Sequence, residues 1–145
     1  MADLYDVNAL LALFDEEHEK HDPVNERFDR NIAHGWASCP LTQNGYLRIR
    51  SQPGYPRPLS LAEAYEQLQD ATSSQHHQFI ADDISLLDDT LVRFRDLAGP
   101  RQLTDVYLLA VPVAHGARLV TLDRRIPLGA VRGATEGHLV VIQAT

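Results

Sequence analysis

The sequence predicts an α/β fold, specifically a three-layer α/β/α sandwich with a mainly parallel central sheet. Three observations lead to this prediction. Short apolar segments with strand character alternate with segments whose apolar residues recur at helical spacing. Glycines and prolines separate many of these segments. The length of 145 residues suits one domain, so we expect a single domain over residues 1–145.

The composition predicts a protein that folds without covalent or metal cross-links. Hydrophobic residues make up 44% of the chain, enough to bury a sizeable core. The single cysteine, Cys39, excludes an internal disulfide and any multi-cysteine zinc site. The apolar runs are shorter than a membrane span. Acidic residues stand near the first residue, where a signal peptide would carry positive charge. We therefore expect a cytoplasmic protein that does not associate with membranes.

The net charge of the chain argues against one class of function, general binding of nucleic acid. Acidic residues outnumber basic ones by 20 to 13, which gives a net charge of −7. Proteins that coat nucleic acid are usually basic, because their affinity comes from neutralising phosphates. An enzyme that gathers acids around a divalent cation remains compatible with this charge, since the cation reverses the local sign. The charge argues against general coating of DNA or RNA and leaves metal-dependent chemistry open.

The first quarter of the chain is predicted to form a strand and two helices. The strand covers residues 4–8, and Asn8 is a plausible N-cap for a buried helix that starts over residues 9–14. A second helix is expected between Asp22, as its cap, and Gly35, because a proline follows Asp22 and glycine favours helix ends. Apolar residues of this helix recur every four positions, at Val24, Phe28 and Ile32.

A second strand and a third helix are predicted next. Residues 36–39 form a compact apolar segment, and Pro40 suits the first turn of the helix that follows. Gly45 costs this helix about 1 kcal/mol relative to alanine, and close packing of the backbone would account for it. Residues 52–58 contain three prolines and a glycine, so we expect a loop there.

The middle of the chain is predicted to contain two more helices around a third strand. Ser60 and Glu63 have capping-box spacing, and the helix after Ser60 is amphipathic over residues 61–68. Residues 77–81 are a strand candidate. Residues 85–97 are predicted to be helical, with their leucines and phenylalanine facing inward.

The last third is predicted to contain one helix and two strands. The helix starts at Thr104 and ends at Gly116, and Pro112 is an anomaly because proline removes a helical hydrogen bond. Residues 118–123 and 138–143 have the Val-, Ile- and Leu-rich character of strands.

Three acidic residues from distant parts of the sequence are expected at one edge of the sheet. Asp6 and Asp123 lie at the ends of predicted strands, and Asp105 opens a helix directly after a loop. Active sites of parallel α/β sheets lie at the carboxyl ends of the strands. Carboxylates are the ligands that Mg²⁺ and Mn²⁺ prefer, and such a site can activate water for attack on phosphorus.

Four sequence blocks carry a resemblance to a known family. They are LYDVNALLAL (residues 4–13), GWASCPLTQNGYLR (35–48), RQLTDVYLLA (101–110) and TLDRR (121–125). In this order they resemble the motif series of PIN-domain proteins, and more narrowly the VapC-type toxins of bacterial toxin–antitoxin pairs. The match extends over most of the chain.

The resemblance implies a Mg²⁺-dependent endoribonuclease, in which Mn²⁺ can substitute, that forms a homodimer and is inhibited by a cognate antitoxin. It implies that Asp6, Asp105 and Asp123 bind the metal and act in catalysis on RNA. Asn8 and Thr104 match supporting polar positions that would orient the acids. A helix cap is an equally good interpretation of both.

One residue departs from the family pattern. Many members carry a glutamate where this chain has Gln43, so the site would hold one negative charge fewer and would bind a second metal more weakly. Asp82 or Asp83 could replace that acid, although such pairs more often lie on solvated loops. The departure motivates an alternative function, a catalytically weak PIN-like module that binds RNA or a partner. DNA cleavage is a third interpretation, because the same metal chemistry acts on both nucleic acids.

Basic residues supply candidates for substrate binding. Arg124 and Arg125 directly follow Asp123 and are placed to contact RNA phosphate or an antitoxin carboxylate. Arg48 and Arg50 are weaker candidates of the same kind. A generic surface position is an equally good interpretation of all four arginines.

The remaining candidates have simpler interpretations. Cys39 has no obvious base partner and is expected to be a small buried residue. His18 and His21 have helical spacing that would suit a metal, but exposed polar side chains are the preferred interpretation.

Overall fold

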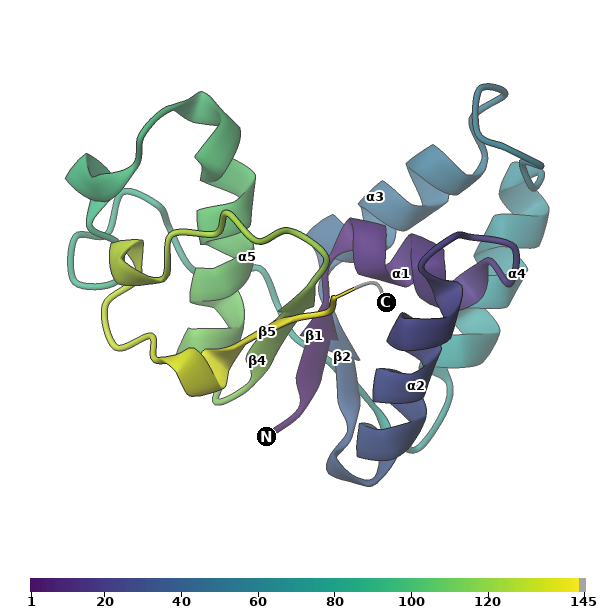
Figure 1. Ribbon diagram of the computed structural model, residues 1–145, viewed down its shortest axis with the longest axis horizontal. Coiled ribbons are helices and arrows are strands. Elements are labelled where there is room, and N and C mark those ends of the chain that lie inside the picture. The colour runs from purple at the N-terminus through teal and green to yellow at the C-terminus, as the bar shows by residue number, and fades with distance from the viewer. Residues whose placement is uncertain (144–145) are drawn as a thin grey trace.

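The computed structural model describes residues 1–143 and places a five-stranded sheet between layers of helices (Figure 1). Neighbouring strands are all parallel, in the order β3-β2-β1-β4-β5. The strands are β1 (Asp3–Tyr5), β2 (Trp36–Ser38), β3 (His77–Phe79), β4 (Arg118–Thr121) and β5 (Leu139–Val141). The predicted parallel α/β sandwich is therefore confirmed, and each strand lies where the sequence predicts one.

Four of the α-helices cover one face of the sheet, and the fifth covers the other (Figure 1). The helices are α1 (Val7–Phe14), α2 (His21–Asn31), α3 (Pro40–Arg50), α4 (Leu61–Thr72) and α5 (Leu103–Ala114). Alternate residues of each strand face opposite layers, so Tyr5 packs among α1–α4 while Leu4 packs against α5. Within residues 1–143, none of the helices is long and apolar enough to span a membrane.

The layer formed by α1–α4 contains an aromatic cluster around Trp36. The ring of Trp36 lies edge-on to Phe14 and Phe28, with centroid separations of 6.1 and 5.6 Å. Val24, Phe28 and Ile32 belong to the same core, which confirms the helical face predicted from their spacing. These contacts fix α1 and α2 against the sheet.

Gly45 allows α1 and α3 to approach closely. A Cβ atom added at Gly45 would lie 2.5 Å from Cγ2 of Val7, which is closer than non-bonded carbon atoms approach in proteins. The close packing that would account for this glycine is therefore present.

The predicted helix over residues 85–97 is wrong. This segment is irregular apart from a 3-10 turn at Phe94–Asp96. Ser85 Oγ and Asp88 Oδ1 accept hydrogen bonds from backbone amides two residues further on, at 3.0 and 2.9 Å, and these local bonds compete with helical ones. The segment also turns side chains outward, since Leu87 is 88% exposed and Phe94 is 52% exposed.

The helix boundaries differ from the predicted ones at two N-termini. Asp6 rather than Asn8 caps α1, because β1 ends earlier than predicted and the Asp6 side chain accepts the Ala9 amide. Asp22 lies in the first turn of α2 rather than at its cap. Ser60 caps α4 as predicted, and the helix continues to Thr72.

Pro112 lies near the end of α5. Its position two residues before the last helical residue limits the lost hydrogen bond to the final turn. The Pro112 carbonyl accepts the amides of His115 and Ala117, and these two bonds cap the C-terminal end of the helix. The chain then enters β4 through Gly116, which has a positive φ of 70°.

Candidate functional site

Asp6 lies at the carboxyl end of β1, the central strand, and is held from two sides. Its Oδ1 accepts the Ala9 amide of α1 at 2.8 Å, and its Oδ2 accepts the hydroxyl of Thr121 at the end of β4. The side chain is 7% exposed. One carboxylate oxygen therefore caps a helix, while the other connects two neighbouring strands.

Asp105 and Asp123 reach the same edge of the sheet from α5 and β4. Asp105 is in the first turn of α5, and Asp123 follows the last residue of β4 by two positions. Both are partly buried and line a hollow of about 440 Å³ together with Arg101 and Arg125. Parallel topology thus brings acids that are distant in sequence to one edge, as predicted.

Thr121 is a site residue that sequence reasoning missed. Besides donating to Asp6, its Oγ1 accepts the backbone amide of Asp123 at 3.0 Å, so one buried hydroxyl orients two acids. The only sequence signal is a polar residue at the end of an apolar strand, two positions before an aspartate.

The three carboxylates influence one another. The pKa of Asp6 is raised to about 6, chiefly by burial and also by the charges of Asp105 and Asp123, against the lowering effect of its bonds from Thr121 and Ala9. The pKa of Asp105 is also raised, by burial and then by the charge of Asp123, while Arg125 lowers it. Without a cation, the carboxylates oppose each other's ionisation.

The donor chemistry fits a hard divalent cation. Such ions take carboxylate oxygens and retain several waters, and a shared positive charge would relieve the repulsion among these acids. Within residues 1–143, however, no three His, Cys, Asp or Glu side chains are already gathered into a metal-holding group. The three acids lie near one another at this edge of the sheet but do not form a closed cage.

Gln43, on α3, forms a hydrogen bond with the last residue of β2. Its Nε2 donates to Ser38 Oγ at 2.9 Å, and the Ser38 hydroxyl also contacts His77 Nε2 at 2.7 Å. These bonds hold the amide at the carboxyl end of β2 and link Ser38 to the first residue of β3. A neutral side chain in a local hydrogen-bond network thus occupies the position where the resemblance implies an acid.

Asp82 and Asp83 have other partners. Asp82 Oδ2 accepts the Leu41 amide at 3.0 Å in the first turn of α3, and Asp83 Oδ1 contacts His115 Nε2 at 2.7 Å. Both aspartates are exposed, as expected for a pair on a solvated loop. Neither contact directs a carboxylate toward Asp6.

The predicted supporting and substrate-binding residues divide into two groups. Arg124 and Arg125 are exposed and line a separate hollow of about 620 Å³ on the other side of Asp123, which we call the Asn8 hollow because Asn8 also lines it. Thr104 is exposed in the first turn of α5, next to Asp105.

The two arginines of α3 lie apart from the acids. Arg48 is exposed and lines neither of the two hollows beside Asp123. Arg50 is buried, lies 3.6 Å from Asp15 Oδ2 and donates to the Arg57 carbonyl at 3.2 Å. Both interpretations of Arg50, substrate binding and a generic surface position, are therefore wrong, because its guanidinium is buried and bound to Asp15 and the Arg57 carbonyl.

The remaining sequence candidates have local roles. Cys39 is fully buried, as predicted. His18 and His21 are partly buried rather than exposed, since His18 Nδ1 accepts the Lys20 amide at 3.0 Å and His21 Nδ1 donates to the Ala12 carbonyl at 2.8 Å. Each ring nitrogen bonded in this way stabilises the turn between α1 and α2.

Comparison with known proteins gives a consistent result, although no protein-family model matches the chain. The sequence is 46% identical over 142 residues to Ribonuclease VapC44 of Mycobacterium tuberculosis, covering 98% of this chain and 100% of that protein. It is 40% identical to Ribonuclease VapC38 of the same organism, covering 83% of this chain and 84% of the relative.

Structural comparison supports the fold. The crystal structure of VapBC2 from Rickettsia felis bound to a DNA fragment from its promoter contains a chain that superposes with a TM-score of 0.57. The superposition covers 97% of each chain at 12% sequence identity. At that identity the likeness shows that the two chains share a fold.

Proposed function

This chain belongs to the VapC family of PIN-domain ribonucleases, and from that membership we propose that it cleaves RNA as the toxin of a toxin–antitoxin pair. The observation that carries the proposal is the approach of Asp6, Asp105 and Asp123 at the carboxyl edge of the sheet. A site built from carboxylates beside arginines suits hydrolysis of a phosphodiester bond.

In this proposal the three aspartates hold Mg²⁺, with Mn²⁺ able to substitute. A divalent cation supplies Lewis acidity that activates water and neutralises charge on phosphate. Asp6 contributes a carboxylate whose orientation the Ala9 amide and the Thr121 hydroxyl fix in advance. With a pKa of about 6, Asp6 is mostly ionised at neutral pH even before a cation lowers that pKa.

The neighbouring cations bind the substrate in this proposal. Arg101 and Arg125 line the hollow that contains Asp105 and Asp123, and Arg124 lines the adjacent one. Guanidinium groups match phosphate through paired N–H donors, so these arginines position the RNA backbone beside the acids. Asn8 lines the same hollow as Arg124, and its side-chain amide can donate to the RNA backbone there.

The proposal includes a partner and a location. VapBC2 of Rickettsia felis is a complex bound to promoter DNA, and we extend only the idea of an antitoxin partner to this chain. The active protein is a cytoplasmic homodimer in this proposal. Co-expression with the adjacent reading frame and sedimentation of the purified proteins test the partner and the dimer together.

Removal of single carboxylates tests the proposed activity. We expect Asp6→Asn and Asp105→Asn each to reduce Mn²⁺-dependent cleavage of total cellular RNA by more than about 100-fold, since an amide supplies no negative charge. Asp70→Asn, an exposed change on α4, is the matched control and should retain full activity. Full activity of either site variant would reject the assignment.

A catalytically weak binding module is the second candidate. Gln43, held by Ser38 in place of an acid, and the open arrangement of the three aspartates favour it. Calorimetry with Mn²⁺ separates the two candidates. Absence of Mn²⁺ binding, together with RNA binding but no cleavage by the purified chain, would establish the binding module.

A further inference from the structure

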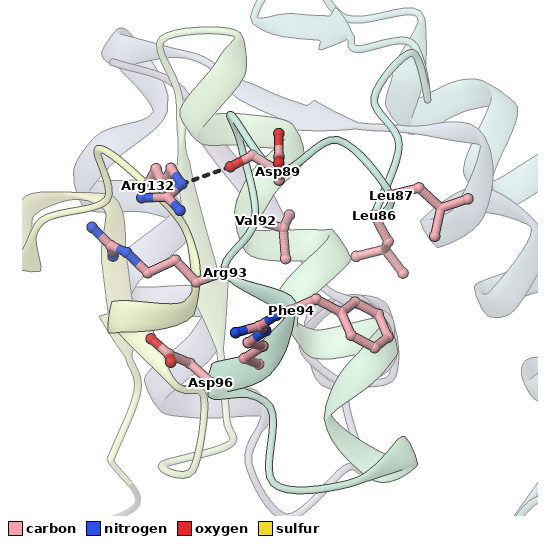
Figure 2. Close-up of a pocket in the computed structure, with 9 residues that line it drawn as sticks. Leu86, Leu87, Asp89, Val92, Arg93, Phe94, Asp96 and Arg132 are labelled. Atoms are coloured by element: carbon pink, nitrogen blue, oxygen red, sulfur yellow. Dashed lines mark hydrogen bonds between the residues drawn. The ribbon is translucent and has the colours of Figure 1, made fainter.

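Three adjoining hollows lead away from the acids along the α5 side of the molecule. The first, which contains Asp105 and Asp123, shares Gly99 and Pro100 with a second hollow of about 280 Å³. The second shares Phe94 with a third hollow of about 530 Å³ (Figure 2). A polymer that lies across the acids could therefore extend along these adjoining hollows.

Two arginines are fixed at the third hollow. Arg93 Nη1 donates to the Gly129 carbonyl and Arg132 Nε to the Asp89 carbonyl, each at 2.7 Å (Figure 2 shows the second bond). An isolated antiparallel bridge joins the residues that directly precede the two arginines, which fixes both backbones. The two cations are thus positioned before any ligand arrives.

The charge of these arginines is available to a ligand. Their bonds end on neutral carbonyls, and across residues 1–143 neither Arg93, Arg95 nor Arg132 forms an ion pair with a carboxylate. Asp89 and Asp96 line the same hollow, so three arginines face two aspartates there. In a chain of net charge −7, this is a local excess of positive charge that suits an anionic ligand.

Phe94 supplies an aromatic surface between the acids and the arginines. It begins the 3-10 turn Phe94–Asp96, is 52% exposed and lines both the second and the third hollow. Figure 2 shows its ring directed away from the turn, on the side opposite to Arg93. Phe94 and the three arginines nevertheless line the same hollow, and a flat apolar ring combined with guanidinium groups is an arrangement by which proteins hold unpaired nucleotides.

We propose that a single-stranded segment of the RNA substrate runs from the acids across the ring of Phe94 to Arg93, Arg95 and Arg132. A base stacks on Phe94, and the following phosphates bind the arginines. This inference rests on the proposed RNA cleavage. Continuity with the acid-containing hollow favours RNA over an acidic peptide or a second copy of the chain, because a cleaved polymer must leave the acids on both sides.

Binding of oligouridylates of two lengths tests this path. Asp105→Asn serves as the background to prevent cleavage, and fluorescence anisotropy measures binding of labelled strands of about 4 and about 12 nucleotides. We expect Arg93→Ala combined with Arg132→Ala to weaken binding of the longer strand about tenfold and that of the shorter strand less than about twofold. The salt dependence should also fall, by about 0.7 in log–log slope for each phosphate that the variant no longer neutralises.

Substitutions of Phe94 separate stacking from apolar packing. Phe94→Leu should weaken binding of the longer strand about tenfold, within the range for loss of one stacked base, while Phe94→Tyr should retain it. Asp96→Asn should tighten binding, since it removes an opposing charge. Arg30→Ala is the matched control, because it removes one exposed arginine from α2 on the other face of the sheet.

The outcomes are distinguishable. Equal losses for both strand lengths, or no loss for the longer one, would overturn the proposed path. A change in sedimentation with unchanged RNA binding would assign the surface to a second copy of the chain and also overturn it. Cleavage of total RNA by the unmodified protein, measured in parallel, shows whether the proposed function itself holds: no cleavage defeats both proposals, whereas cleavage with unaltered binding defeats only the path.

Discussion

A single hydroxyl, that of Thr121, connects two acids whose positions in the sequence differ by more than one hundred residues. It donates to Asp6 and accepts the amide of Asp123 at 3.0 Å. We expect Thr121→Val, which keeps the shape of the side chain, to lower RNA cleavage about 10- to 100-fold, because ligand carboxylates lose orientation without their outer partners. Thr121→Ser should retain most activity. Equal cleavage rates for the valine variant and the unmodified protein would contradict this role.

Asp15 gives a prediction about stability and pH. Burial raises the pKa of its carboxyl group, but hydrogen bonds from the Tyr55 hydroxyl and the Glu17 amide, with the charge of Arg50, more than offset this and hold the pKa below its usual value. A lowered pKa in the folded state stabilises the protein above the ordinary aspartate pKa of about 4 and loses that contribution as the pH falls through the folded-state value.

We therefore expect Asp15→Asn to lower the free energy of unfolding by about 1–2 kcal/mol at pH 7, and by less at pH 3.5, where part of the charge contribution is lost. Urea unfolding at the two pH values measures the difference. Asp22→Asn, an exposed change in the first turn of α2, is the control. A deficit of equal size at both pH values would show that the carboxylate charge is unimportant.

At the scale of secondary structure, the contact between α1 and α3 depends on Gly45. Alanine at this position would favour the helical conformation by about 1 kcal/mol relative to glycine, but its Cβ would lie 2.5 Å from Val7. We expect Gly45→Ala to destabilise the protein by about 1–3 kcal/mol, as overpacking generally does. Adding Val7→Ala should recover part of the loss in thermal unfolding. Additive losses in the double variant would contradict the steric explanation.

The elements differ in how far the sequence predicts them. The five strands are predictable because short apolar runs bounded by turn residues are a local sequence signal. Helix α4 is predictable because Ser60 and Glu63 form a capping box. The segment over residues 85–97 has apolar spacing compatible with a helix, but Ser85 and Asp88 bind nearby amides instead. The surrounding fold decides which of these competing hydrogen bonds form, and the periodicity of apolar residues carries no information about that fold.

The candidate site shows the same division. Asp6, Asp105 and Asp123 are predictable because each stands at an element boundary and parallel topology gathers such boundaries. The role of Thr121 and the burial of Arg50 depend on partners that are distant in sequence or on packing, so spacing alone does not reveal them.

Across the whole molecule, mutual repulsion of the three acids predicts a response to metal ions. We expect millimolar Mn²⁺ to raise the midpoint of thermal unfolding, because an ion that binds only the folded state stabilises it by about 2.7 kcal/mol at a hundredfold excess over its dissociation constant. Chelation should reverse the shift, and Asp105→Asn should reduce it. An unfolding midpoint that is unaffected by Mn²⁺ would show that the acids do not bind the ion.

The strand order has a consequence for the synthesis of this protein. The central strand β1 is synthesised more than 100 residues before its neighbour β4, which carries Thr121 and is followed by Asp123. A nascent chain that already displays Asp6 therefore lacks both the hydroxyl that orients it and at least one of its companion carboxylates. Under the proposed function, we therefore expect a chain whose synthesis stops before Thr121 to be unable to cleave RNA.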